Sequence, residues 1–183
     1  MPDTADLFES LEHAIRTLFI KTITRKEVND VERNLIALPV RYGGLGIGNP
    51  VDLCKISHAN SLFVSAPLVR LVARQEAEFG PRELQAEVIK LRAEIDKRNE
   101  TTSKAKLQDV LGSASPVLKK AVQAASEKGA SSWLTAVPTY DHGTILHKGD
   151  FVDSLCIRYG WAIQGLPLNC GCGAPFSLQH ALD

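Results

Sequence analysis

Apolar residues recur at spacings of three and four along most of this chain, a pattern that is typical of amphipathic helices. Leu7, Leu11 and Ile15 form the first stripe. Similar stripes follow at residues 26–37, 50–72, 84–95, 116–125 and 150–159. No segment alternates apolar and polar residues over enough length to require a sheet. The pattern therefore predicts a mainly α fold, an irregular multi-helix bundle with a small turn-rich C-terminal tail.

Proline and glycine divide the stripes into separate helices. Asn49 is expected to cap a helix that begins at Pro50, the helical position that proline favours, and Ser115 is expected to start another. Pro67 should kink or divide the helix that contains it. Residues 43–48 hold four glycines, which predict a tight turn where backbones approach closely.

A short apolar seam follows Pro81. Its members are spaced by four, three and four residues, and the seam is too short for a convincing coiled coil. They are Leu84, Val88, Leu91 and Ile95. Residues 97–106 after it indicate an exposed helix or a flexible joint. If a partner covers the seam, the chain is a helical protein–protein interaction module.

The composition and charge of the chain exclude several classes of protein. The 183 residues include 21 basic and 21 acidic side chains, so the formal net charge is zero, and a strongly basic nucleic-acid tail is excluded. There is no run of about 18 apolar residues, so no membrane span is expected. The N-terminus lacks the features of a secretory signal, and an intracellular, reducing compartment is expected. The four cysteines then do not predict a disulfide framework.

The candidate metal ligands lie in the C-terminal tail. Cys170 and Cys172 are each followed by glycine, and His180 comes eight residues after the second cysteine. Thiolate and imidazole are preferred ligands of zinc, but a structural site needs four ligands and the sequence offers three. The alternative is that the cysteines are small buried groups and His180 a surface imidazole. No acid pair or nucleophile–base arrangement indicates an enzyme.

Three segments together resemble a known family. Residues 38–47 (LPVRYGGLGI), residues 127–135 (EKGASSWLT) and the cysteine-containing tail are similar to the region after the polymerase core in reverse transcriptases of non-LTR retrotransposons. The resemblance covers most of residues 30–183. It implies a thumb-like helical segment at 1–80, a helical linker region at 81–165 and a truncated zinc-knuckle-like tail at 166–183.

The resemblance implies a role without catalysis, because the palm with its catalytic aspartates would lie upstream. It implies zinc at an incomplete knuckle, with Cys170, Cys172 and His180 as ligands and the last cysteine one position past Asp183. The partners would be the missing palm and nucleic acid, the latter bound weakly in isolation and through phosphate contacts. The candidate contacts are Arg92, Lys97, Arg98, Lys104, Lys106, Lys119 and Lys120.

Overall fold

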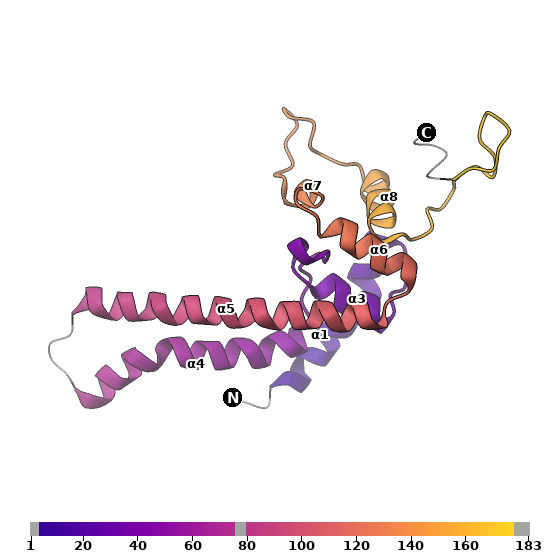
Figure 1. Cartoon of the computed structure of the whole chain (residues 1–183). Coiled ribbons are helices and arrows are strands. Elements are labelled where there is room, and N and C mark those ends of the chain that lie inside the picture. The colour runs from indigo at the N-terminus through magenta and orange to yellow at the C-terminus, as the bar shows by residue number, and fades with distance from the viewer. Residues whose placement is uncertain (1–3, 76–79, 178–183) are drawn as a thin grey trace.

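The computed structural model describes residues 4–75 and 80–177 and consists of helices and connecting turns (Figure 1). Within these residues the only β pairing is one isolated bridge between Asn169 and Pro175. The prediction of a mainly α fold is therefore confirmed.

The chain opens with a nearly continuous helical run that changes its winding three times. It comprises the 3₁₀ turn η1 (Ala5–Phe8), α1 (Glu9–Ala14), the π-helical segment η2 (Ile15–Ile20) and α2 (Lys21–Thr24). The run ends at Arg25, which adopts a left-handed conformation with φ of 51°. Ile20 and Thr24 are buried at its end.

Helix α3 (Asp30–Ala37) begins later than the sequence stripe suggests. Its start is fixed by a capping box, in which the Glu32 N–H donates to Asn29 Oδ1 (2.9 Å) and the Asn29 N–H donates to Glu32 Oε2 (3.0 Å). The prediction of a helix from Lys26 is therefore wrong. Val28 is buried, as expected, but it lies in the extended segment before the cap.

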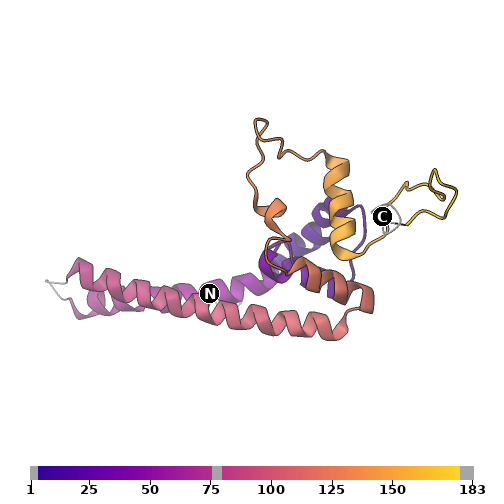
Figure 2. The same ribbon diagram turned by 45° about the horizontal axis from the view of Figure 1, so that its top comes forward.

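Helices α4 (Pro50–Arg74) and α5 (Pro81–Ser113) form a long antiparallel arm, which Figures 1 and 2 show reaching away from the other helices. Two ion pairs tie the helices together: Asp52 with Lys106 near the base (3.2 Å) and Arg70 with Glu87 towards the tip (2.9 Å). Pro67 is buried and leaves α4 undivided, although Figure 1 shows that α4 is not straight.

The remaining helices close the body of the molecule. They are α6 (Pro116–Ala125), the single turn α7 (Ser132–Thr135) and α8 (Lys148–Tyr159). Asn49 caps α4 and Ser115 caps α6, as predicted. Helix α6 ends at Ala125, and Gly129, with φ of 88°, lies in the turn beyond it.

One core joins segments that are distant in the sequence. Its fully buried members come from α3, α5, α6 and α8, together with the residue that follows α3. They are Leu35, Leu38, Val110, Leu118, Val122, Leu155 and Tyr159. Residues before and after position 80 therefore contribute to the same core, and the sequence-predicted segments 1–80 and 81–165 meet there.

The glycine-rich segment passes through the centre of this arrangement, directly after the turn η3 (Val40–Tyr42). A Cβ atom on Gly44 would stand 1.9 Å from the Leu38 carbonyl oxygen, so only glycine fits there. The Tyr159 hydroxyl donates to the Gly43 carbonyl (3.0 Å), and Arg158 donates to the carbonyls of Val40 and Gly44 (3.3 and 3.4 Å). The prediction of a tight turn with close backbone approach is confirmed.

Candidate nucleic-acid interface and cysteine turn

The predicted cations of α5 do not share one face, because successive residues turn by about 100° around a helix. Lys106 points to α4, where it pairs with Asp52. Arg98 lies over the Phe63 ring of α4, with 4.9 Å between the guanidinium carbon and the ring centroid, and pairs with Glu94 (3.3 Å). These two cations therefore hold the arm together.

Lys97 and Lys104 lie on the opposite side of α5. They are seven residues apart, so they share a face, and both are exposed. Lys90, seven residues earlier, continues the row and is exposed too. Lys90 is not among the cations predicted from the sequence, although its spacing of seven from Lys97 is visible there. Lys104 is partly neutralised by Glu100 (3.4 Å), so the row offers a modest cationic surface.

Positive charge accumulates towards the base of the arm. Residues 97–125 hold six Lys or Arg and two Asp or Glu side chains, which is a surplus of four in a chain that is neutral as a whole. Lys120 is exposed and Lys119 half-buried on α6, and Arg92 is exposed on α5. Within the part of the chain that the structure describes, none of the cations Arg92, Lys97, Lys119 and Lys120 forms an ion pair.

Glu100 connects this cationic region to the glycine turn. Its carboxylate accepts hydrogen bonds from the Tyr42 hydroxyl and from Arg41, both in η3. The Tyr42 hydroxyl, with help from Arg41 and Lys104, lowers the pKa of Glu100 below its ordinary value. The carboxylate therefore stays ionised at neutral pH and fixes α5 on the body.

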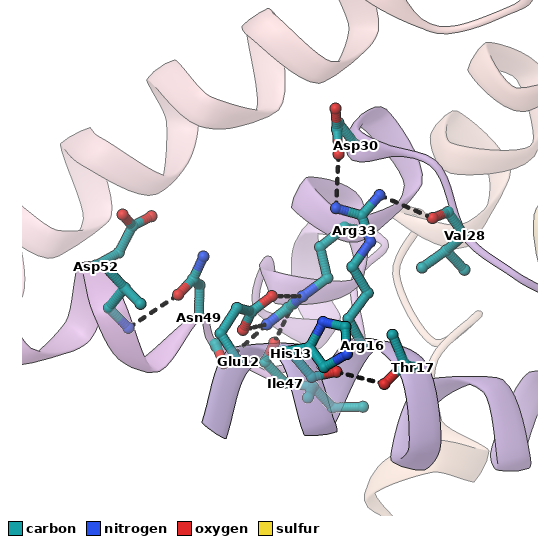
Figure 3. Close-up of polar contacts among 12 residues, drawn as sticks. Glu12, His13, Arg16, Thr17, Val28, Asp30, Arg33, Ile47, Asn49 and Asp52 are labelled. Carbon is teal, nitrogen blue, oxygen red and sulfur yellow. Dashed lines mark hydrogen bonds and ion pairs between the residues drawn. The ribbon is translucent and has the colours of Figure 1, made fainter. Parts of the chain in front are cut away.

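Figure 3 shows a second polar cluster, where the N-terminal helical run meets the end of the glycine-rich segment. Arg33 donates from Nε and Nη2 to the two carboxylate oxygens of Glu12 (2.6 and 2.7 Å) and also to the carbonyls of Ile47 and Gly48 (2.8 and 3.2 Å). Only 4% of the Arg33 side chain is exposed. Arg33 therefore stabilises the fold, and its buried guanidinium cannot contact a phosphate.

The seam of α5 is covered by the same chain. Leu84, Val88 and Leu91 are half-buried and Ile95 is buried. Helical rotation places them on the side of α5 from which Arg98 and Lys106 contact α4. A partner could reach this seam only by displacing α4. Residues 97–106 are helical, so of the two predictions the exposed helix is confirmed.

Cys170 and Cys172 lie in a tight turn of the tail. The Cys170 N–H donates to the Ala174 carbonyl (2.7 Å), and the Gly173 N–H donates to the Cys170 carbonyl (2.8 Å). Hydrogen bonds from the Cys172 backbone and side chain, and from the Gly171 backbone, lower the pKa of the Cys170 thiol. The turn therefore favours the thiolate form of Cys170, which is the form that binds zinc.

The third sequence-predicted ligand, His180, lies outside the described residues. Within residues 4–75 and 80–177, no three His, Cys, Asp or Glu side chains gather in a geometry that could hold a metal ion. Cys156 is buried, and burial raises the pKa of its thiol, which makes it a poor nucleophile.

The chain matches no family model, no curated protein and no solved structure. Of the helices in the described ranges, none is both long enough and apolar enough to cross a bilayer.

Proposed function

We propose that this chain is a non-catalytic, nucleic-acid-contacting part of a reverse transcriptase of the non-LTR retrotransposon type. The observation that carries the proposal is the positive surplus of residues 97–125, which form the base of the projecting arm and the helix α6 that follows it. Lysines on exposed helix faces meet phosphates as point charges, so the contact is electrostatic and does not read sequence.

The contact residues are the row Lys90, Lys97 and Lys104 on α5, together with Lys120 on α6, all of which are exposed. Arg98 and Lys106 contribute charge at a distance while they hold α4 and α5 together. A surface with so few cations binds weakly, and its affinity falls steeply as salt concentration rises. In a longer polypeptide the palm would supply the remaining contacts.

The proposal includes a zinc ion bound by the C-terminal tail. Cys170 and Cys172 would supply two thiolate ligands, and His180 an imidazole. A bound zinc ion would hold the tail as a compact knuckle. Its two positive charges would be balanced by the two thiolates, so zinc would order the tail without adding net charge.

The experiment is fluorescence anisotropy with a labelled RNA–DNA duplex and the full chain, titrated at several salt concentrations. The double substitution K97Q/K120Q should weaken binding roughly tenfold at low salt and reduce the salt slope by about two. The matched control, K21Q/K148Q, removes two exposed lysines elsewhere. Equal losses in both variants, or no binding by the native chain, would contradict the proposal.

A further inference from the structure

The outer half of α4 carries an apolar stripe that nothing in the described structure covers. Its members recur at spacings of three and four, and each of them is exposed. They are Ala59, Leu62, Ala66, Val69 and Ala73. We call them the outer α4 stripe. Leu62 and Val69 are each 60% exposed, and Val72 beside them is 69% exposed.

Helical rotation places the outer α4 stripe on the side of α4 away from α5. Pro67, which is buried, lies on the inner side. Between Ser61 and Ala73 the only charged side chain is Arg70. A helix that is apolar on all sides is normally buried, and here one side is already against α5. The other side is therefore an exposed apolar surface of the kind that marks an interaction site.

We infer that the partner is a second copy of this chain, and that two arms pair antiparallel through the outer α4 stripe. The stripe repeats every seven residues, with alanine at one position of the repeat and leucine or valine at the other. Antiparallel pairing sets Ala66 opposite the second copy's Val69, and Leu62 opposite the second copy's Ala73. Each layer then joins a small and a large side chain, which allows close packing.

Charge favours the same orientation. Lys55, which is exposed, continues the stripe towards the base of the arm. Antiparallel arms keep the two Lys55 side chains of a dimer apart, because the base of one chain lies towards the tip of the other. Parallel arms would instead set Lys55 beside its own copy.

The size of the contact fits a weak dimer. The exposed parts of the stripe and of Val72 amount to about 400 Å² per chain, hence about 800 Å² in total, which is the size of a weak, transient contact. The twofold axis would fall near Pro67 and Leu68, in the outer half of the arm. The bodies of the two chains then lie at opposite ends and do not collide.

The test is sedimentation velocity on the full chain over a range of concentrations. The native chain should pass from monomer to dimer as concentration rises. Val69→Glu should weaken the dimer by at least about tenfold, because it places a charge in an apolar contact. Val137→Glu, which changes an equally apolar and 75% exposed residue outside the stripe, should have no effect.

Both glutamate variants should keep the helicity of the native chain by circular dichroism. Glutamate is a good helix former at the exposed position 69, and Val137 lies outside the helices. Leu62→Gln provides a second variant with the same expected loss. A native chain that remains monomeric at every concentration overturns the inference, and so does a dimer that tolerates both Val69→Glu and Leu62→Gln.

Cysteine cross-linking tests the orientation of the two arms. The experiment uses a chain in which Cys170 and Cys172 are replaced by serine. A mixture of Ala66→Cys chains with Val69→Cys chains should cross-link under mild oxidation more than either variant alone. Stronger cross-linking of each variant with itself would overturn the antiparallel arrangement.

Discussion

Arg33 and Glu12 form a two-point ion pair in which the arginine side chain is almost completely buried. The pair joins the N-terminal helical run to α3, and through the carbonyls of Ile47 and Gly48 it also holds the segment that leads into α4. The Arg33 guanidinium therefore links the N-terminal run and α3 to the start of the arm.

Glu12→Gln leaves the Arg33 charge buried without its counter-ion. We expect the free energy of unfolding to fall by about 3 kcal/mol, measured by urea denaturation. Replacing both partners, as Glu12→Gln with Arg33→Met, should recover part of that loss, because no buried charge remains. A double variant as unstable as the sum of the two single variants would show that the pair is not coupled.

Gly44→Ala places a Cβ atom against the backbone of Leu38 and Leu35. The chain cannot relax around two carbonyl groups, so we expect a loss of about 3 kcal/mol or more and a clearly lower melting temperature. Gly112→Ala is the control, since its Cβ would meet open space in α5. That substitution should leave stability unchanged or raise it by up to about 1 kcal/mol.

Tyr159 makes stability depend on alkaline pH. Burial raises the pKa of Tyr159 to about 12, so the folded chain favours the neutral phenol. The stabilisation is complete below the ordinary tyrosine pKa of about 10 and is lost as pH rises towards 12. Tyr159→Phe should cost about 1 kcal/mol at neutral pH, through the lost hydrogen bond to Gly43.

Urea denaturation at increasing pH tests whether ionisation of the Tyr159 phenol destabilises the folded chain. The difference in unfolding free energy between the native chain and Tyr159→Phe should shrink above pH 10. A constant difference up to pH 12 would mean that the phenol does not ionise on unfolding.

Glu100 acts at the other end of the pH scale. The pKa of its carboxylate is lowered, chiefly by the Tyr42 hydroxyl. Its stabilising contribution is therefore present above the ordinary glutamate pKa and is lost as pH falls through the lowered value. Glu100→Gln should unfold at a lower urea concentration than the native chain at neutral pH, and the two midpoints should converge in acid. Parallel midpoints throughout would contradict this.

The tail offers a prediction about metal. If Cys170 and Cys172 are zinc ligands, elemental analysis of the purified chain should find about one zinc per chain. Cys172→Ser should lose that zinc, whereas Cys54→Ser, which changes a half-buried cysteine of α4, should keep it. A native chain without zinc, in a zinc-containing medium, would contradict the knuckle.

Local signals account for what could be predicted from the sequence. Asn49–Pro50 and Ser115–Pro116 mark helix starts by their own chemistry, and α3 could have been placed correctly as well, because Asn29 and Glu32 are a visible capping box. The glycine turn was predictable because few other structures tolerate four glycines in six residues.

Long-range pairing could not be predicted. Arg33 and Glu12 are 21 positions apart, and no spacing rule joins them. The sequence alone does not show that Lys106 is paired. Only the register of α4 against α5 places it beside Asp52. The same register decides which apolar face of the arm is covered. For this reason the sequence pointed to Leu84, Val88, Leu91 and Ile95, and the uncovered face turned out to lie on α4.

The hydrogen bond from Tyr159 to Gly43 spans 116 positions of the chain. During synthesis the glycine turn leaves the ribosome long before α8. Until α8 has been made, the carbonyls of the turn lack their hydrogen-bond donors and the apolar side chains of α3 lack part of their packing. A nascent polypeptide that stops short of residue 159 therefore lacks one wall of its interior. Such a polypeptide would expose the apolar side chains that α8 covers in the complete chain, which favours capture by chaperones and cleavage by proteases.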